Sequence, residues 1–496
     1  MMWRESQIEK RQKYRIPPAG IAFLGGVLIS FIYVSLFYPD TYVYDSAHYW
    51  ALSYGFADEQ GNLSLAAYPS DFRGYVFPLY LFLSRVFSHW LGISDSLGFI
   101  CLVAVSVSFI LTIVFPYLMD WREKNSWDFL KRWIPLFLVL FFWRGLLVYP
   151  LSDFYSLGFT LVACALFKWL YNDHRVWWSE IPASILIGVF LYAAYNTRTI
   201  YLFAVIVFAC LICLRFLKEG RLGAGKNVIR LVCIVAGWFL LAAPQIWINH
   251  RYTGTWSLWG VDTTDMFSAG LFSFQLFNGL TVDRYETLLT PNDFGNIPNI
   301  YFYDDVGLQI IKSIGNYEGT LWEYIRLFFT YPLEVIGIYF RHLANLLNPV
   351  YGECYISNLH QFKIHVSVFN YILMVFTAIG GVDLLQKYRC IYENQAGKRK
   401  TKILIASFFE DTSLWWVIIF PCLAIIPGAP EVRFFFPAYV CMYGLLAFKI
   451  QWKRVAQCIT THPIQTILWS VVGLVVLSCV WSDTFANAST NVWLFL

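Results

Sequence analysis

Two aspartates, Asp40 and Asp45, follow closely on a long apolar run that ends at Tyr38. A carboxylate at such a surface is partly removed from water, which raises its pKa and makes it a better proton acceptor. Aromatic side chains surround both acids: Tyr42, Tyr44, Tyr49, Trp50 and Tyr54. We therefore expect Asp45 to act as a general base, with Asp40 as the second candidate. The alternative interpretation is that both are ordinary solvated loop acids.

Arginines near the ends of apolar runs form a second group of candidates. Arg198 and Arg433 lie at turns between closely spaced runs, and Arg144 lies six residues before the end of its run. A guanidinium stays charged and pairs with two phosphate oxygens at once, which suits it to a lipid phosphate. A charge deep in the bilayer costs about 2.5–3.5 kcal/mol. We therefore expect Arg144 to extend toward the membrane surface or to pair with Asp153. The alternative is that these arginines only anchor the helix ends at the membrane interface and bind no ligand.

Membrane helices must hold these residues, because the composition excludes an ordinary soluble protein. Of 496 residues, 58% are hydrophobic and only 14% are charged, against about 25% charged in soluble domains. Apolar runs of roughly 18–23 residues match the ~30 Å hydrocarbon core. We predict an all-α polytopic membrane protein with about eleven transmembrane helices. The predicted spans are 17–38, 97–119, 133–150, 154–171, 181–197, 199–217, 228–248, 366–386, 412–427, 433–449 and 464–481.

The distribution of basic residues predicts the orientation. Of 36 Lys and Arg, 25 fall in the segments 1–16, 120–132, 168–180, 215–230, 387–402 and 449–463. The positive-inside rule places these segments in the cytoplasm, with the N-terminus inside and the C-terminus outside. Because they flank spans, we interpret them as topology determinants that touch anionic lipid and not as nucleic-acid sites. We expect a multi-pass protein of the plasma (inner) membrane with its active site on the outer face.

Two large outer segments separate the predicted spans. The predicted organisation is an N-terminal transmembrane module over 1–250 with a first outer loop over 39–96, a large outer loop over 251–365, and C-terminal transmembrane helices over 366–496. In the large loop, polar residues recur every three or four positions from Glu323 to Asn345. This spacing predicts an interfacial helix that is bent or broken near Pro332.

Six short segments combine charged and aromatic residues near the ends of predicted spans. They are Asp45-Ser-Ala-His-Tyr49, Phe72-Arg73-Gly-Tyr-Val-Phe-Pro78, Tyr149-Pro-Leu-Ser-Asp153, Asn196-Thr-Arg198, Pro244-Gln-Ile-Trp-Ile-Asn249-His-Arg251-Tyr-Thr-Gly254 and Pro430-Glu431-Val-Arg433-Phe-Phe-Phe-Pro437. In order and placement the set resembles the C-type glycosyltransferase superfamily, in the branch of protein O-mannosyltransferases and bacterial aminoarabinose transferases. Ser46 stands where that family has a second acid, and Thr199 where it has a proline.

The resemblance implies an inverting glycosyltransferase that moves a sugar from a polyprenyl-phosphate donor to a glycan, lipid or protein acceptor. It implies Asp45 as the base that takes the acceptor's proton, with Asp40 second. It implies arginines that hold the lipid phosphate and an aromatic groove for the isoprenoid chain. The substrate-binding residues implied are Tyr49, Arg73, Arg144, Asp153, Arg198, Glu431 and Arg433.

Two other functions remain as alternatives. One is an envelope polysaccharide polymerase or ligase that uses lipid-diphosphate glycans. The other is a lipid or glycan transporter without chemistry, but transporters tend to carry ionisable groups at the bilayer midplane, whereas this chain keeps its charges at the ends of the spans. A divalent cation is possible as a cofactor. His48 and His89 on the outer side are candidate ligands for it, but no spacing around them predicts a metal site.

Overall fold

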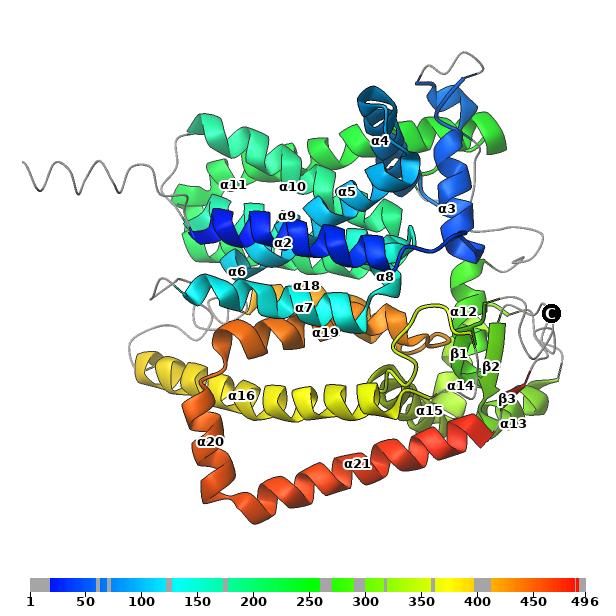
Figure 1. Ribbon diagram of the computed structural model, residues 1–496, viewed down its shortest axis with the longest axis vertical. Helices are drawn as coiled ribbons and strands as arrows, with labels where there is room; N and C mark the ends of the chain where they lie inside the picture. The colour runs from blue at the N-terminus through cyan, green and yellow to red at the C-terminus, as the bar shows by residue number, and fades with distance from the viewer. Residues whose placement is uncertain are drawn as a thin grey trace, which may run out of the picture.

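The computed structural model is a bundle of long helices that run side by side, with shorter helices and a small sheet at one end (Figure 1). It describes residues 18–58, 63–68, 73–121, 127–172, 177–258, 270–289, 299–315, 319–357, 362–396, 412–486 and 488–489. Within these ranges, nine helices are long and apolar enough to cross a membrane. The chain is therefore a multi-pass membrane protein, as its composition predicted.

The nine long apolar helices coincide with nine of the predicted spans. They are Pro18–Leu36, Asp95–Leu118, Ser152–Tyr171, Trp178–Thr197, Thr199–Phe216, Gly225–Thr253, Ile364–Val382, Val432–Lys449 and Pro463–Thr484.

Five of these spans lie in single helices: α2, Pro18–Leu36; α9, Ser152–Asn172; α10, Trp177–Thr197; α16, Ile364–Ala396; and α21, Pro463–Ala486. The second span consists of α5, Asp95–Ser108, the π-helix η2, Phe109–Val114, and α6, Phe115–Leu118. The spans Thr199–Phe216 and Gly225–Thr253 are formed by η4, Thr199–Tyr201, and α11, Leu202–Thr253. The span Val432–Lys449 consists of η5, Val432–Phe435, α19, Phe436–Gly444, and η6, Leu445–Lys449.

The other two predicted spans are shorter helices. Residues 412–427 contain α18, Ser413–Ile425, and residues 133–150 contain α7, Trp133–Phe142, followed by α8, Gly145–Val148. The interruption at Trp143–Arg144 has a direct consequence. It places Arg144 at the junction of two helices, where its long side chain can leave the apolar surroundings, and not in the interior of a continuous span.

Helix α11 doubles back between its two spans. The guanidinium carbons of Arg215 and Arg230 lie 4.8 and 4.7 Å from the ring centroid of the same residue, Tyr171. A straight helix would separate these two arginines by about 22 Å at 1.5 Å rise per residue. The two halves of α11 therefore run in opposite directions, and both pack near α9 and α10.

The segment 39–96 between the first two spans contains three short helical elements: α3, Tyr44–Tyr54, η1, Leu65–Ala67, and α4, Val76–Leu91. Glycine 92 ends α4 in the left-handed conformation, with φ of +66°, which favours glycine. The basic segment 120–132 ends in η3, Asp128–Arg132. In the C-terminal part of the chain, α20 spans Trp452–Thr461.

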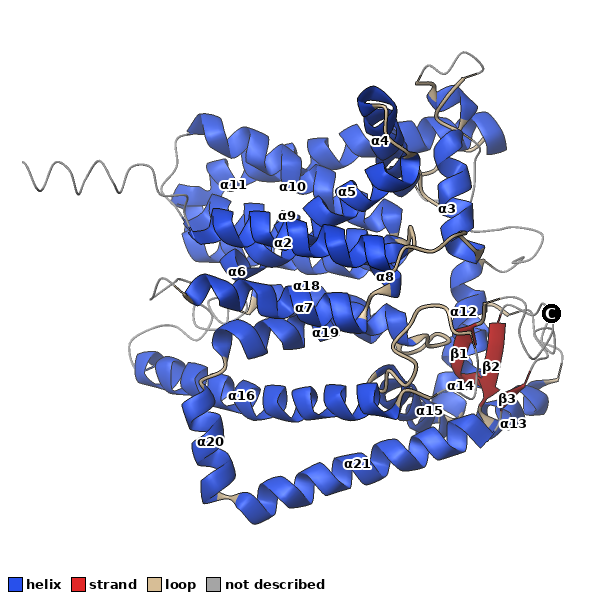
Figure 2. Ribbon diagram, viewed as in Figure 1, coloured by secondary structure: helices blue, strands red, loops and turns tan. Residues whose placement is uncertain are grey.

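The segment 251–365 is not purely helical, so the all-α prediction is incomplete here. It contains α12, Leu271–Thr281, β1, Val282–Thr287, β2, Asn299–Tyr303, α13, Asp305–Ile314, α14, Leu321–Thr330, and α15, Pro332–Leu346. An antiparallel sheet in the order β1-β2-β3 forms there, with β3, Ala488–Ser489, contributed from beyond α21 (Figure 2). The predicted break near Pro332 is confirmed, because α14 ends at Thr330 and α15 begins at Pro332.

The elements of the two segments 39–96 and 251–365 gather at the same end of the bundle. Helices α3 and α12 and the sheet lie at the right of Figure 1, where α2 and α8 end. The largest group of buried apolar residues fills the bundle itself and draws on α5, α7, α9, α18 and α19. This packed core holds the helix ends in place, and the charged residues of interest lie on those ends.

Candidate active site

Asp45 lies in the first turn of α3, and the local sequence explains how that helix starts. The Ser46 hydroxyl accepts a hydrogen bond from the Val43 amide at 3.1 Å and donates one to the Val43 carbonyl at 2.5 Å. Between them, Tyr44 has φ of +47°, a left-handed conformation that costs a bulky residue about 1–3 kcal/mol. Ser46 thus helps to fix the helix start that presents Asp45.

Each carboxylate oxygen of Asp45 pairs with a different arginine. Arg73 Nη2 lies 2.5 Å from Oδ1, and Arg433 Nη2 lies 3.1 Å from Oδ2. Arg73 precedes α4, and Arg433 lies in η5, 388 residues after Asp45 in the chain. Arg73 is itself positioned by His48, whose Nδ1 accepts a hydrogen bond from Nε at 3.2 Å, and by the ring of Tyr49, 4.6 Å below its guanidinium. The sequence-predicted residues Asp45, Tyr49, Arg73 and Arg433 therefore meet in one place.

The pKa of Asp45 is lowered, and the expectation of a raised pKa is wrong. Burial of the carboxyl does raise the pKa, as expected, but the charges of Arg73, Arg433 and Arg198 outweigh it and hold the pKa at about 2. Asp45 is therefore fully ionised at neutral pH. It becomes a good proton acceptor only if a ligand draws part of this positive charge away.

The second ion pair of the site joins Arg198 to Asp153. Arg198 lies between α10 and η4, and its Nη1 donates to Oδ1 of Asp153 in the first turn of α9. The Asp153 side chain is 6% exposed. The guanidinium of Arg198 also lies 4.6 Å from the ring centroid of Phe434, the residue after Arg433. Arg198 therefore lies beside η5, the short helix that contains Arg433.

For Arg144 the sequence left two expectations, extension toward the membrane surface or pairing with Asp153, and the structure shows no such pairing. Arg144 does not pair with Asp153; its Nη2 lies 2.8 Å from Glu353 Oε1, because the α7–α8 junction points it toward the segment before α16. Asp40 is exposed on the connection between α2 and α3, and no ion pair joins it to the site in the described part of the chain. The role of Asp40 as second candidate base stays a prediction. Tyr49 bridges instead to α9, since its hydroxyl donates to Ser152 Oγ at 3.2 Å.

Arg433 is the residue that links the parts of the site. Its Nε donates to Glu431 Oε2 at 2.6 Å, and its Nη2 donates to Asp45. Its Nη1 is buried and has no hydrogen-bond partner among the described residues. Glu431 is 2% exposed, and this burial raises its pKa to about 7 despite the adjacent guanidinium. One buried donor of Arg433 is therefore left for a ligand.

Strand β1 adds two charged residues that the sequence patterns did not identify. Arg284 Nε donates to Glu286 Oε1 at 2.6 Å, and Arg284 Nη1 donates to the Asn348 carbonyl at 2.9 Å. Between them in sequence, the Tyr285 amide donates to the Pro430 carbonyl at 3.1 Å, which ties the strand to the segment that carries Glu431. Burial raises the pKa of Glu286. The sequence signal that could have paired Arg284 with Glu286 is their spacing of two residues, because alternate residues of a strand point to the same side.

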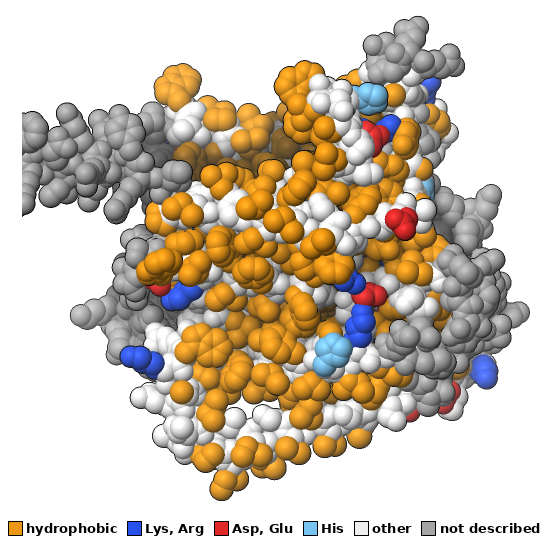
Figure 3. Space-filling model, viewed as in Figure 1, with side chains coloured by type: hydrophobic (Ala, Val, Ile, Leu, Met, Phe, Trp, Pro, Cys, Tyr) orange, Lys and Arg blue, Asp and Glu red, His pale blue; other side chains and the backbone are white. Residues whose placement is uncertain are grey.

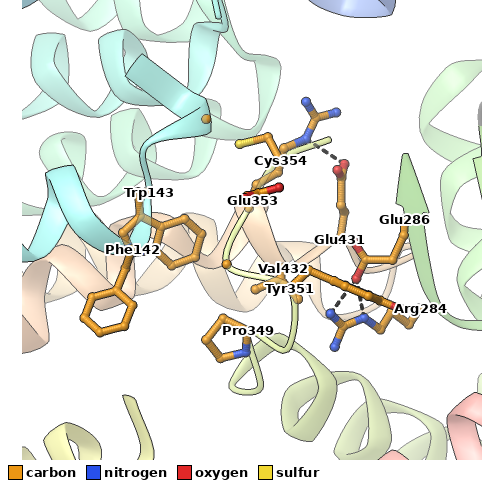
Figure 4. A pocket seen from close by; sticks show the side chains of 13 residues that line it. Phe142, Trp143, Arg284, Glu286, Pro349, Tyr351, Glu353, Cys354, Glu431 and Val432 are labelled. Carbon is orange, nitrogen blue, oxygen red and sulfur yellow. Dashed lines mark hydrogen bonds and ion pairs between the residues drawn. The ribbon is translucent and has the colours of Figure 1, made fainter. Parts of the chain in front are cut away.

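Two cavities adjoin at Arg433. The larger is lined by Phe142, Trp143, Gly145, Arg284, Glu286, Pro349, Tyr351, Gly352, Glu353, Cys354, Glu431, Val432 and Arg433. In Figure 4 its aromatic wall, Phe142 and Trp143, lies across from the Arg284–Glu286 pair. The smaller is lined by Asp153, Arg198, Ile200, Tyr201, Pro421, Cys422, Ile425, Arg433, Phe434 and Pro437.

The two cavities differ in chemistry. The smaller presents two arginines over an apolar floor, which suits a phosphate that carries a hydrocarbon chain. The larger presents Glu286, Glu353 and Glu431 together with Arg284 and Arg433, opposite aromatic rings, which suits a polyhydroxylated group. Asp45 contacts Arg433, which lines both cavities. Within the described ranges no three His, Cys, Asp or Glu side chains come together as a metal site, and we assign no metal to this centre.

Comparisons of the chain with family models, with curated proteins and with solved structures find no match. Function therefore has to be inferred from the residues of the site and their arrangement.

Proposed function

We propose that this protein is a membrane glycosyltransferase that moves a sugar from a polyprenyl-phosphate donor to an acceptor hydroxyl at the outer face of the membrane. The observation that carries the proposal is the Asp45 carboxylate bridging Arg73 and Arg433, beside two cavities that share Arg433. The motif order that resembles C-type glycosyltransferases supports it, since Asp45, Arg73, Asp153, Arg198 and Arg433 come from five of the resembling segments.

In this proposal the smaller cavity holds the donor phosphate. Arg198 and Arg433 offer planar, permanently charged forks for its oxygens, and Nη1 of Arg433 supplies a buried donor that no described residue satisfies. The same arginines stabilise the lipid phosphate as it departs with the electron pair of the broken bond. The apolar lining, including Ile200, Ile425 and Phe434, offers contacts to the first isoprene units.

Asp45 takes the acceptor's proton in this mechanism. A phosphate that draws Arg433 and Arg198 toward itself removes part of the charge that keeps the pKa of Asp45 near 2. Asp45 then accepts the hydroxyl proton while the acceptor oxygen bonds to the anomeric carbon and the carbon–phosphate oxygen bond breaks. Attack opposite the leaving phosphate inverts the configuration at that carbon. Donor binding and activation of the base are thus coupled through Arg433.

The outer-face assignment is supported by the position of the site relative to the basic segments. Lys131 and Arg132 precede α7, whereas Arg144 follows it, so the predicted cytoplasmic segment 120–132 and the site lie at opposite ends of that helix. The positive-inside rule then puts the site outside.

The proposal is tested with purified protein and radiolabelled polyprenyl-phosphate sugars, with release of polyprenyl phosphate as the readout. We expect release by the wild-type protein and not by Asp45→Asn. Asp305→Asn, which removes an exposed carboxylate in the first turn of α13, is the matched control and keeps full activity. Consumption of diphosphate-linked glycans alone would favour the polymerase or ligase alternative. Full activity in Asp45→Asn would contradict the assigned base.

A further inference from the structure

A small charged cluster interrupts an apolar face of the bundle. Figure 3 shows a mostly hydrophobic surface with a few basic, acidic and histidine side chains between the right-hand ends of α7 and α16. The described residues of this region include Arg144, Glu353 and Lys363, which we call the surface triad. Their side chains are 29%, 26% and 38% exposed, respectively. All three side chains of the surface triad are thus partly accessible from outside.

The surroundings of the surface triad are apolar and outward-facing. Exposed hydrophobic residues from three helical regions border it: Phe37 at 43%, Phe141 at 59%, Ile364 at 57% and Phe369 at 46%. The Arg144 guanidinium lies 4.4 Å from the ring centroid of Phe37. In a membrane protein such residues face acyl chains. The triad therefore lies where lipid tails meet polar groups at the end of the bundle.

The surface triad carries more positive charge than its carboxylate can satisfy. Arg144 Nη2, at 2.8 Å, and Lys363 Nζ both pair with one atom, Glu353 Oε1. Two cations on one carboxylate leave a net charge of +1, and exposed His365 lies two residues after Lys363. A phosphate offers separate oxygens to the fork of Arg144 and to the amine of Lys363. Exchange of Glu353 for a phosphate would thus improve the pairing of both cations.

Glu353 also connects this surface to the site. It lines the larger cavity together with Trp143 and Gly145, the residues on either side of Arg144, and the same cavity extends to Arg433. A headgroup held at Arg144 and Lys363 is therefore next to the space that leads to Asp45. This path is separate from the smaller cavity, which Arg198 lines.

We propose that Arg144 and Lys363 bind the phosphate headgroup of a membrane lipid in exchange for Glu353, and that this lipid carries the acceptor into the larger cavity. The inference rests on the proposed function and narrows it: the acceptor is lipid-anchored, not a soluble protein. Donor and acceptor then approach Arg433 from two cavities, and each is oriented by its own phosphate.

The test measures binding of radiolabelled phosphatidic acid to the whole protein in phosphatidylcholine nanodiscs. We expect Lys363→Ala to weaken binding about fivefold, the contribution of one basic residue to an anionic lipid. We expect Glu353→Gln to strengthen it, because the competing carboxylate charge is lost. Lys312→Ala is the matched control: Lys312 is an exposed lysine in the last turn of α13, outside both the surface triad and the basic segments, and binding should not change.

Several results would overturn the inference. Unchanged binding in both Lys363→Ala and Glu353→Gln would show that the lipid headgroup does not bind to the surface triad. Competition by inorganic phosphate at the same concentration as the lipid would show that no acyl chain is recognised. Loss of binding in Arg198→Ala alone would place the probe in the smaller cavity and leave the proposed function intact. Conversely, the expected Lys363 and Glu353 effects without any sugar transfer would support the lipid site while contradicting the proposed function.

Discussion

At Asp45, charge matters more than burial. Its location near the membrane suggested a desolvated, basic carboxylate, but two guanidiniums contact it and a third lies close enough to act on it. The carboxylate therefore stays ionised and holds Arg73 and Arg433 in position until a ligand arrives. This arrangement suits a residue that must serve as a base only after an anionic substrate has bound.

Replacement of Asp45 by Asn should lower sugar transfer by about 10²–10⁴-fold, the usual contribution of a general base. Expression should be retained, because Arg433 keeps its 2.6 Å pair with Glu431 and Arg73 is only partly buried. Initial rates with labelled donor, normalised to folded protein by size-exclusion chromatography, measure the effect. A rate within twofold of wild type would rule out this role.

The raised pKa of Glu431 predicts that donor binding depends on pH. Burial raises this pKa to about 7, so below pH 7 the carboxyl is neutral and Arg433 is free to attract a phosphate. Above pH 7 the carboxylate forms and competes with the phosphate for the same guanidinium. The apparent KM for the lipid donor should therefore rise about tenfold between about pH 6 and pH 8, the change expected for one linked proton. Glu431→Gln should remove this dependence; a wild-type KM that is flat over this range would contradict the linkage.

Among the structural elements, the close pair α10 and α11 positions Arg198. A Cβ at Gly188 would lie 1.9 Å from the Ile234 carbonyl oxygen, and a Cβ at Gly237 would lie 2.0 Å from the Ile185 carbonyl oxygen. The helices thus pack backbone against backbone, as small residues permit in membranes. Arg198 follows directly on Thr197, the last residue of α10, so the crossing fixes where its guanidinium points.

Gly237→Ala should destabilise the protein by about 1–3 kcal/mol, because the added methyl group forces the two helices apart. Thermal unfolding in detergent should show a lower midpoint. Gly225→Ala is the control in the same helix: a Cβ there meets nothing within 4 Å, and its midpoint should equal that of the wild type. Equal midpoints for both variants would mean that the α10–α11 contact tolerates separation.

For the whole molecule, the arrangement of helix ends separates a basic side from the site. The elements that carry Asp45, Arg284 and Arg433 gather at one end of the bundle, and Lys131 and Arg132 lie before the other end of α7 (Figure 1). In the proposed reaction, substrates carried by lipids would reach this end of the bundle laterally, within the membrane.

This orientation predicts the accessibility of two single cysteines in a cysteine-free background. Asp305→Cys, on exposed α13, should react with a membrane-impermeant maleimide in intact cells. Lys131→Cys, whose parent side chain is 46% exposed, should react only after permeabilisation. The positive-inside bias is the physical reason. The reverse pattern would place the site in the cytoplasm and exclude the proposed outer-face reaction.

Local patterns were sufficient for part of this picture. Apolar runs of bilayer length predict helices because an unpaired backbone is too costly in hydrocarbon, and nine of the predicted spans match long helices in the described residues. Proline likewise predicts the break before Pro332. Short polar motifs at helix ends also identified Asp45, Arg73, Arg198 and Arg433 as candidates, because isolated charges next to a membrane are costly unless they are used.

The partners of those charges required the folded chain. Arg144 pairs with Glu353 and not with Asp153, and Arg433 reaches Asp45 across 388 residues. Which carboxylate a guanidinium meets depends on helix crossings, on an interrupted helix such as α7–α8, and on strand β1, whose Arg284 and Glu286 have no helical periodicity to reveal them. These are distances between segments remote in sequence, and a Coulomb interaction depends on such distances, whereas hydropathy and periodicity report only on neighbours along the chain.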